Sequence, residues 1–485
     1  MEIPSHLQLE PAPLWRHFYH LTQLPRPSKH EDKVRQHLLA LAERTGHRAR
    51  VDEVGNVVIY VPASKGKEGA TPVIIQNHMD MVTDAGPDIS INFHTDPITT
   101  RREGDWIKAS GTTLGADNGI GCAAAMALLE DKALVHPPLE LLFTIDEETG
   151  LKGAWGVDGS FFEGKRLLNL DTEEWGSFYI GCAGGIDYEL EGELGLVDGS
   201  FSDPCTLRLT VSGFKGGHSG VDIHQQRGNA IKFLAHVLTR FSGEDFLLTE
   251  LRAGKAHNII PRDAWARLVV EKEQVARLEE VAHEVRAEWL GFLPSEDQGL
   301  ALSFEVCDDE SRGLGGADLR RVLAFLSAFP HGAHSFDLAS QRELVALSNN
   351  LALCYFVKGR FYVLSSLRFF DRHECRPLEA QVQALGALLG LKVTKHGEYP
   401  SWKPVRENRL LDQMCAVYQR QHGKAPRITA IHAGLECGIL RDRIGPVDAV
   451  SFGPTIVNAH SPDEAVHIPS VTQFWQLFVS VLAEI

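Results

Sequence analysis

Cysteine is scarce in this sequence, and its eight cysteines are scattered along the chain. A thiolate zinc site or a redox motif needs cysteines paired a few residues apart, so the spacing excludes both. The N-terminus also lacks a basic segment followed by an apolar run, and no stretch approaches the roughly 18 apolar residues of a membrane span. We therefore expect reduced cysteines and a cytoplasmic protein.

Positive charge is also in short supply. The chain carries 48 Lys and Arg against 64 Asp and Glu, a formal net charge of -16. Nucleic-acid binding usually needs a concentrated basic face, so we expect no nucleic-acid partner. The acidic surplus is explained either by a solubilising surface or by carboxylates gathered to hold cations, and charge alone does not decide between them.

Helical and strand patterns alternate in the first part of the chain. From Leu14 to about Gly185, amphipathic stretches alternate with short apolar runs, among them residues 72–77, 139–145 and 166–170. This alternation predicts an α/β domain with a mainly parallel sheet covered by helices. Acidic residues or histidine follow each of these runs within three residues. Ligands of such sheets bind at the carboxyl ends of the strands, so a site is expected there.

The pattern changes in the middle of the chain. Between about residues 186 and 397, strands of alternating polarity are separated by helices, which predicts an α+β module. After this module the α/β pattern returns. We therefore expect one α/β domain made of residues 1–187 and 399–485, interrupted by an inserted α+β domain at 188–398.

His78 and Asp80 follow the first of the three apolar runs. Residues i and i+2 of a strand face the same side, so the imidazole and the carboxylate can meet. A carboxylate so placed would fix the tautomer of a metal-binding histidine. Taken alone, the pair is explained more simply by a structural histidine.

Two further motifs deliver carboxylates. A glycine-rich turn at residues 111–121 brings Asp117 to the start of an expected helix, where an N-cap is the simpler role. Glu147 and Glu148 belong to an acidic run after the second apolar run, and a solvated loop explains them equally well. At the mouth of a sheet, however, one carboxylate can bind metal while its neighbour moves protons.

Asp171 and His460 complete a set of polar residues that stand just past a strand or in a loop bounded by Gly or Pro. Each is ordinary as a single loop residue. Together the set offers two histidines and three carboxylates, the donors that zinc and similar divalent cations prefer. Its members are His78, Asp117, Glu148, Asp171 and His460.

These motifs resemble the aminoacyl-histidine dipeptidases, also called cytosol non-specific dipeptidases, of the wider aminoacylase and carboxypeptidase metallopeptidase clan. The resemblance extends from residue 24 to residue 471 and rests on HMDMV, GTTLGADNGIG, DEETG, NLDTEE, KGGHSG, HNIIPR, IHAGLECG and HSPDE, in this order. It implies an α/β di-zinc catalytic domain interrupted by an α+β lid domain. The implied reaction is hydrolysis of dipeptides, Xaa-His and broader, by a hydroxide that bridges two zinc ions.

The resemblance also implies how the set divides between the metals. Asp117 would bridge the two zinc ions, and the peptide bond that follows it would be cis. His78 and Asp171 would complete the coordination of one zinc ion, while Glu148 and His460 would complete that of the other.

Further residues take roles in the reaction by the same resemblance. Glu147 would be the general base, and Asp80 would orient His78. From the inserted domain, His218 would bind the scissile carbonyl and stabilise the oxyanion. Arg368 would bind the terminal carboxylate of the substrate, assisted by Asn258.

Two other functions stay open at this point. An aminoacylase or carboxypeptidase of the same clan would cleave N-acyl amino acids. A metal-stabilised binding protein without turnover would have lost the base or a ligand, and all six of these positions are intact. We expect two Zn²⁺ per chain, with Mn²⁺ or Co²⁺ as substitutes, small peptide substrates, and no membrane partner. A homodimer through the lid domain, and delivery of His218 in cis or across that dimer, stay open.

Overall fold

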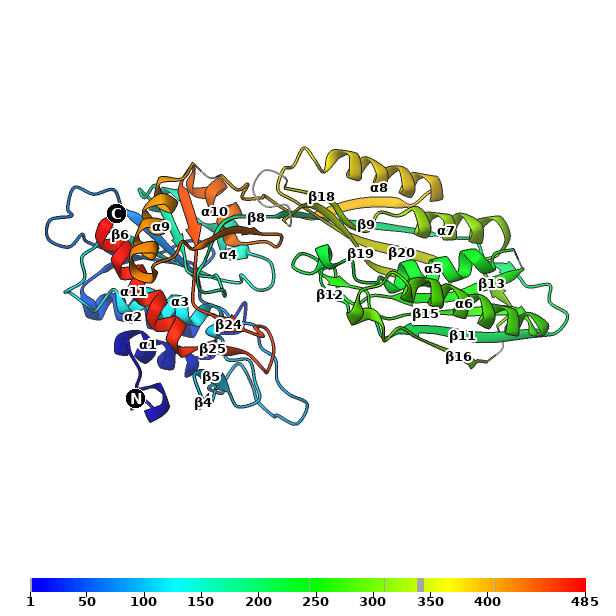
Figure 1. Ribbon diagram of the computed structural model, residues 1–485, viewed down its shortest axis with the longest axis horizontal. Coiled ribbons are helices and arrows are strands. Elements are labelled where there is room, and N and C mark those ends of the chain that lie inside the picture. Colours follow the sequence, from blue (N-terminus) through cyan, green and yellow to red (C-terminus); the bar gives the residue numbers. More distant parts are fainter. Residues whose placement is uncertain (1, 244, 309, 338–343, 406) are drawn as a thin grey trace. The chain divides into compact units, whose positions relative to one another are not determined.

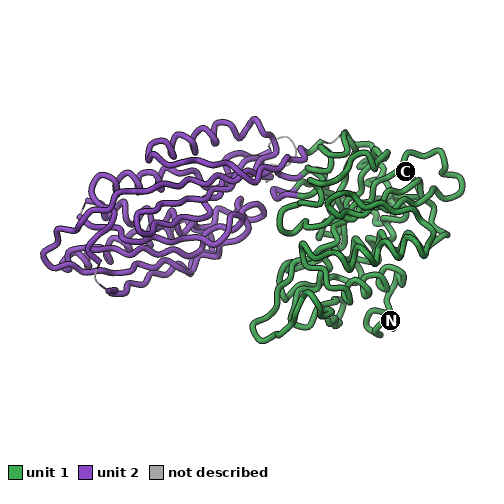
Figure 2. The backbone as a smooth tube through the Cα atoms, turned by 180° about the vertical axis from the view of Figure 1, so that it is seen from behind, with its two compact units in different colours: residues 1–181, 404–430, 435–485 green, residues 182–403, 431–434 purple. Residues whose placement is uncertain are grey.

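The computed structural model describes residues 2–243, 245–308, 310–337, 344–405 and 407–485. The chain divides into two compact units (Figure 2). Unit 1 holds the residues up to Gly181, then Pro404–Ala430 and Leu435–Ile485; unit 2 holds Cys182–Lys403 and Ile431–Gly434. The chain therefore leaves unit 1 twice, and the second, short excursion at 431–434 was not apparent from the sequence pattern.

Unit 1 is built on an eight-stranded sheet (Figure 1). The central strands β6, β3, β7 and β23 run parallel, as the alternation of patterns predicts. The outer pairs β1–β2, β2–β6 and β8–β23 are antiparallel. The link from β1 to β2 is too short for the crossover that parallel strands need. The order is β1 (Arg48–Val51), β2 (Val57–Val61), β6 (Leu139–Thr144), β3 (Val73–His78), β7 (Arg166–Asn169), β23 (Asp448–Ser451), β8 (Ser177–Cys182) and β22 (Arg427–Ile431).

Helices cover this sheet and complete the core of unit 1. Strands β3 and β6 are buried along their whole length, which fits the continuous apolar runs of their sequences. Helix α2 packs on β1 and β2, α3 on β3, and α9 on β23, while α1 packs on α3 and α11 on α9. The helices are α1 (Ala12–Thr22), α2 (Asp32–Thr45), α3 (Ala116–Ala127), α4 (Lys152–Gly156), α9 (Arg409–His422), α10 (Glu436–Ile444) and α11 (Ile468–Glu484).

A second, smaller sheet of unit 1 carries residues close to the C-terminus. It is antiparallel, in the order β24 (Ile456–Val457), β25 (Ala465–His467), β5 (Trp106–Ala109) and β4 (Thr100–Glu103). The loop between β24 and β25 contains His460 and Glu464, and the chain between β5 and α3 contains the glycine-rich turn. The pairing of β25 with β5 thus ties together two segments that are far apart in the sequence.

Unit 2 is an antiparallel sheet covered by adjoining helices, consistent with the expected α+β module. Buried and less buried residues alternate along β9 and β11, the pattern of strands with one face against the core. The strand order is β16 (Ala301–Val306), β11 (Pro204–Ser212), β15 (Ala264–Glu271), β13 (Phe246–Ala253), β19 (Val345–Val357), β20 (Arg360–Phe369), β9 (Gly184–Glu193) and β21 (Lys392–Tyr399), with β18 (Gly332–Phe336) beside β19. The helices are α5 (Ala230–Phe241), α6 (Val275–Leu290), α7 (Gly316–Ala328) and α8 (Arg376–Leu389).

Two findings bear on the expectations from composition. All eight cysteines are free thiols in the structure, as their scattered positions predict. Among the residues that the structure describes, no helix combines the length and the apolar character needed to cross a bilayer.

Candidate active site

The polar residues that follow the parallel strands lie at one edge of the unit 1 sheet. His78 is the last residue of β3 and pairs with Thr144, the last residue of β6, while Gln76 pairs with Asn169 at the end of β7. Because these strands are parallel, the segments that follow them emerge at the same edge.

The first group of side chains at this edge centres on His78. Its Nε2 lies 3.0 Å from Asp117 Oδ1 and 3.2 Å from Asp171 Oδ1. Asn118 Nδ2 donates to the carbonyl of Leu170 at 3.0 Å and also to Asp171 Oδ1, which orients that carboxylate. His78, Asp117 and Asp171 each offer a ligand atom within 4.8 Å of the others.

The second group uses the other oxygen of Asp117. His460 Nε2 lies 3.1 Å from Asp117 Oδ2 and 3.0 Å from Glu148 Oε2. These three side chains form another group whose ligand atoms lie within 4.8 Å of one another. Asp117 therefore presents one carboxylate oxygen to each histidine, the arrangement of a carboxylate shared between two sites.

An N-cap role for Asp117 and a solvated loop around Glu148 do not describe these contacts. Gly115 is the N-cap of α3, and the carboxylate of Asp117 faces the two histidines. The side chain of Glu148 is only 5% exposed, so it does not belong to a solvated loop. The Asp117–Asn118 peptide bond is cis, as the resemblance implies.

Asp80 contacts both His78 and the backbone of the acidic segment after β6. Its Oδ1 lies 3.4 Å from His78 Nδ1, and its two oxygens accept the backbone N–H groups of Glu147 at 3.1 Å and Glu148 at 3.2 Å. Ser28 Oγ donates to the same carboxylate at 2.7 Å. One buried carboxylate thus links the histidine of β3 to the acidic segment that follows β6.

The electrostatics show an excess of buried negative charge. Burial, with repulsion from Glu148, raises the pKa of Glu147 well above its usual range. Burial and Asp117 raise the pKa of Glu148, and burial is also the main cause that raises the pKa of Asp171. Hydrogen bonds to Asp117 and Glu148 raise the pKa of His460 to about 11. Like charges gathered in a buried site need positive charge to compensate them.

The donor set fits divalent cations. The two groups together offer imidazole nitrogens and carboxylate oxygens, and Glu148 Oε1 is buried without a hydrogen-bond partner among the described residues. Zinc and similar metals accept this mixture of donors. Asp117 belongs to both of these groups, so its carboxylate is placed to serve two cations.

Sequence reasoning missed several residues that hold this site in place. Glu464 is 2% exposed, and its carboxylate accepts the backbone N–H groups of the four residues 114–117, at 2.7 to 3.2 Å. Arg26 is also 2% exposed and donates to the carbonyls of Met79, Asp80 and Gly115. Glu464 lies within the HSPDE motif and Arg26 near the start of the resemblance, but only the fold shows which backbone groups they bind.

Glu436 is a further buried carboxylate near the base. It is 0% exposed and accepts hydrogen bonds from Thr144 Oγ1 at 2.6 Å and from Gln76 Nε2 at 2.5 Å. Burial raises its pKa to about 8. Glu436 is also one of the like charges that raise the pKa of Glu147.

The three residues expected from the inserted module lie in one region of unit 2. His218 and Ile259 pair between the short strands β12 (Gly217–His218) and β14 (Ile259–Ile260). Ser219 N donates to the carbonyl of Asn258 at 2.8 Å, and Arg368 Nε donates to Ser219 Oγ at 3.4 Å. These three residues lie far apart in the sequence, and the fold of unit 2 links them.

Arg368 is buried among neutral partners. It is 6% exposed, and besides Ser219 it donates to Tyr399 Oη at 3.1 Å. Within the described part of the chain, no carboxylate forms an ion pair with it at 4.0 Å or less. A buried guanidinium without a countercharge is a ready site for an anionic ligand group.

His432 belongs to the same region and was also missed. Its Nε2 lies 2.8 Å from Ser348 Oγ, and Ser348 pairs with Arg368 across β19 and β20. Burial, with the charge of Arg368 as the next cause, lowers the pKa of His432 to about 3, so its imidazole is neutral. His432 lies within the IHAGLECG motif and enters unit 2 through the excursion at 431–434, so only the fold shows what it contacts.

The tautomer of His218 follows from its hydrogen bonds. Its Nδ1 accepts the backbone N–H groups of Gly220 at 3.2 Å and Val221 at 3.1 Å. When Nδ1 is the acceptor in a neutral imidazole, the proton is on Nε2, which is then a donor.

Comparison with known proteins places these features in context. The model of peptidase family M20/M25/M40 matches residues 74–484. The chain is 37% identical over 482 residues to a cytosol non-specific dipeptidase of Escherichia coli (strain K12), covering 99% of this chain and 98% of that protein. The crystal structure of an aminoacylhistidine dipeptidase from Vibrio alginolyticus is similar with a TM-score of 0.86 and 36% identity, covering 99% of this chain and 98% of that one. An aminopeptidase PepT from Bacillus cereus, at 15% identity and a TM-score of 0.55 over 98% of this chain and 99% of that one, shares the fold.

Proposed function

The chain belongs to peptidase family M20/M25/M40, and from this premise we propose that it is a metal-dependent dipeptidase that cleaves unblocked dipeptides, Xaa-His among them. The observation that carries the proposal is the position of Asp117, whose two carboxylate oxygens face two different histidines. The relatives named dipeptidases match nearly the full length of the chain and support the same choice.

Two divalent cations would be held by the groups that share Asp117. His78 and Asp171 would hold one, Glu148 and His460 the other, and Asp117 would belong to both. Zn²⁺ suits the donors, with Mn²⁺ or Co²⁺ as substitutes. When bound, the cations supply Lewis acidity that polarises a carbonyl and acidifies a water molecule.

Glu147 is the proposed general base. It accepts the proton of the attacking water on its carboxylate and passes it to the amine that leaves. Burial and the charge of Glu148 raise the pKa of Glu147. A raised pKa favours the protonated carboxyl group that delivers this proton to the amine. Asp80 is proposed to act through others, since it holds the backbone of Glu147 and the ring of His78.

The residues of unit 2 are proposed to recognise the substrate. Arg368, buried without a countercharge, would bind the free carboxylate of a dipeptide. His218, with its proton on Nε2, would donate to the oxygen of the scissile carbonyl as negative charge develops there. Asn258 would assist at the same region through its contact with Ser219.

A cytoplasmic location and the role of unit 2 as a lid domain belong to the proposal as well. The location is supported by the E. coli relative, which is named a cytosol dipeptidase. The products of the proposed reaction are free amino acids, so the enzyme would act in peptide catabolism. A homodimer formed through unit 2 remains part of the proposal, to be tested by sedimentation.

The experiment is hydrolysis of Ala-His, Leu-Gly, a tripeptide and N-acetyl-Met by metal-stripped protein, before and after Zn²⁺ is restored. Zinc-dependent cleavage confined to the dipeptides is the expected result. Cleavage of N-acetyl-Met in preference would instead support an aminoacylase. No cleavage of any substrate would contradict the proposal and support a binding protein.

A further inference from the structure

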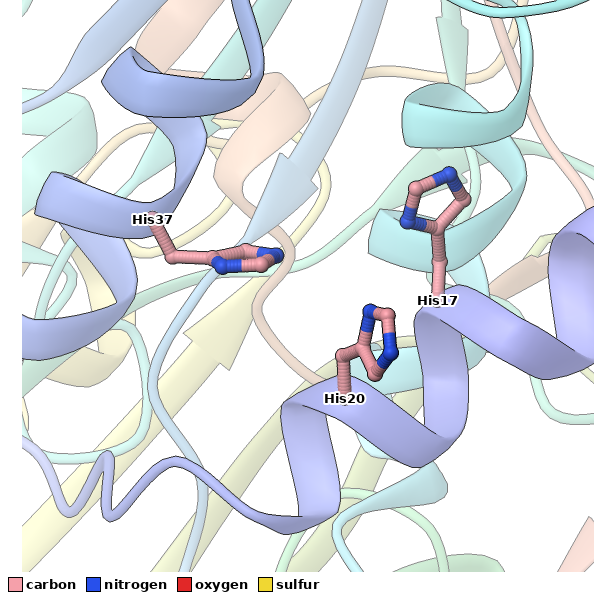
Figure 3. A group of neighbouring side chains, drawn as sticks. All are labelled: His17, His20 and His37. Atoms are coloured by element: carbon pink, nitrogen blue, oxygen red, sulfur yellow. The ribbon is translucent and has the colours of Figure 1, made fainter. Parts of the chain in front are cut away.

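A cluster of three histidines lies in unit 1 among residues that the proposed mechanism does not use. His17 and His20 are three residues apart on α1, so they share one face of that helix, and His37 comes from α2. Each offers a ring nitrogen within 4.8 Å of the others. Figure 3 shows the three rings arranged around a common space, with a nitrogen of each turned toward it.

Two of the nitrogens in this cluster are buried without a partner. The side chain of His17 is 2% exposed, and its Nε2 lies 3.2 Å from Glu130 Oε2. A neutral imidazole that donates from Nε2 to a carboxylate keeps a lone pair on Nδ1. His17 Nδ1 and His37 Nε2 are both buried and have no hydrogen-bond partner among the residues that the structure describes. Two unpartnered ring nitrogens in one cluster are unusual, because buried polar atoms without a hydrogen bond cost free energy.

The histidines are in the protonation state that metals bind. Burial lowers the pKa of His17 to about 4, and burial is also the main cause that lowers the pKa values of His20 and His37. All three imidazoles are therefore neutral at neutral pH. A carboxylate behind a neutral histidine, as Glu130 stands behind His17, commonly orients a zinc ligand and raises its basicity.

The charges around the cluster narrow the class of metal. Arg16 forms an ion pair with Glu130, and Arg44 lies 3.5 Å from the same carboxylate, so the surroundings supply no surplus negative charge. Calcium and magnesium, which need oxygen ligands, are excluded by the donors. Zn²⁺ and its neighbours among the transition metals bind three neutral imidazoles without that charge.

Ring stacking is the competing explanation. His17 and His20 meet edge to face with centroids 6.3 Å apart, and His20 and His37 do so at 6.0 Å. Tetrahedral zinc with bonds of about 2.0–2.1 Å would hold its nitrogen ligands about 3.3 Å apart, so the rings would have to converge slightly. Ring stacking alone leaves the two buried, unpartnered nitrogens unexplained, whereas a cation bound by both would account for them.

We propose that His17, His20 and His37 form a further divalent-metal site, for Zn²⁺ or a similar transition metal, that shares no ligand with the Asp117 groups. The site fastens α1 to α2 at the N-terminal end of unit 1. Since α1 packs on α3, which carries Asp117, the metal would stabilise the helices that support the proposed catalytic groups. The proposal does not depend on the proposed dipeptidase activity.

The test is the Zn²⁺ stoichiometry of the full chain, measured by equilibrium dialysis and elemental analysis. The His20→Asn/His37→Asn variant should bind one Zn²⁺ fewer than the unaltered protein. The matched control is His30→Asn/His94→Asn, which removes another edge-to-face pair, with centroids 4.5 Å apart, and should bind as much as the unaltered protein. Equal binding by all three proteins would overturn the proposal.

A second measurement keeps this site distinct from the Asp117 groups and guards against misfolding of the double variant. In the Asp117→Asn/His460→Asn background, Zn²⁺ should still raise Tm, and the single change His20→Asn should abolish that rise. Activity in this background bears only on the proposed dipeptidase function, because the two changed residues belong to the Asp117 groups and not to the histidine cluster. A zinc-induced rise in Tm that persists with His20→Asn would contradict the histidine site.

Discussion

The two units each bury an unbalanced charge, but of opposite sign. In unit 1, the carboxylates of Asp171 and Glu148, which follow parallel strands, and that of Asp117 in α3 gather around two histidines. In unit 2, the guanidinium of Arg368 is buried among hydroxyl groups and lies near a neutral histidine. Since burying an uncompensated charge is costly, each cluster indicates the sign of what it binds. The first calls for cations, the second for an anionic group such as a carboxylate.

The clusters also differ in how they are held. The cluster of unit 1 lies where strands end and is held by buried carboxylates. Glu464 contributes most, because it accepts the four backbone N–H groups of residues 114–117. Arg368 instead projects from within β20, between the paired strands β19 and β9. Changes in the two regions should therefore be separable: unit 1 changes should affect metal binding or turnover, and unit 2 changes should affect recognition of the substrate.

The largest effect is expected for Glu147→Gln in unit 1. Removing a general base should lower kcat by about 10²- to 10⁴-fold, while the metal content stays the same because Glu147 is not a proposed ligand. Steady-state kinetics with elemental analysis would measure both quantities. Glu53→Gln, an exposed position in the same unit, is the control and should behave like the unaltered protein. Turnover within a few fold of normal for Glu147→Gln would remove it from the mechanism.

Arg368→Met should give the next largest effect. Losing a charge-assisted bond to the substrate carboxylate costs about 1.5–3 kcal/mol, which corresponds to a loss of about 10- to 100-fold in kcat/KM. For a dipeptide amide, which lacks the carboxylate, kcat/KM should fall little. Metal content should not change, and Arg360→Met, an exposed arginine of the same strand, should have no effect. An equal loss for the dipeptide and its amide would contradict carboxylate recognition.

Glu464→Gln should weaken metal binding by roughly tenfold, at the lower end of what partners of metal ligands contribute. The amide has a single acceptor oxygen, so it cannot accept all four backbone N–H groups that position Asp117. Competition with a zinc indicator dye would measure the affinity. Asp463→Asn changes the exposed neighbouring carboxylate and serves as the control. Unchanged affinity in Glu464→Gln would show that the loop keeps its position without this carboxylate.

The smallest effect concerns the stability of unit 2 below neutral pH. The folded protein holds the pKa of His432 at about 3, below the ordinary 6.5, so the unfolded chain binds the proton more readily. The contribution of His432 to stability is therefore complete above pH 6.5 and is lost as the pH falls toward 3. The free energy of unfolding should drop by roughly 1 kcal/mol over the first pH unit below 6.5. His432→Asn should remove this drop, in the presence of a chelator.

The control for this pH dependence is His396→Asn, which changes a half-exposed histidine of unit 2. It should leave the slope of stability against pH as in the unaltered protein. Identical slopes for His432→Asn and the unaltered protein would show that His432 does not titrate as the fold indicates.

The sequence predicted the features that local pattern determines. Apolar runs followed by acids located the strand ends, so His78, Glu148 and Asp171 could be expected near one another. The parallel centre of the unit 1 sheet and the α+β character of unit 2 also followed from periodicity. The roles assigned to single residues came from the resemblance to a known family and not from the pattern.

What the sequence could not predict depends on contacts between distant segments. Glu464 binds backbone groups about 350 positions earlier, and Arg26 reaches carbonyls more than 50 positions away. His432 belongs to the IHAGLECG motif, but periodicity does not show that residues 431–434 enter unit 2. The cluster of His17, His20 and His37 likewise requires α1 and α2 to be packed together before the rings converge.

Anomalous diffraction from crystals of the zinc-loaded protein tests the central claim most directly, because it locates each metal without reference to activity. The account predicts two anomalous peaks that flank the Asp117 carboxylate, one against His78 and Asp171 and one against Glu148 and His460. A single peak beside Asp117, or peaks that leave one of its oxygens without a metal, would contradict the shared-carboxylate site, whatever is found at the separate cluster of His17, His20 and His37.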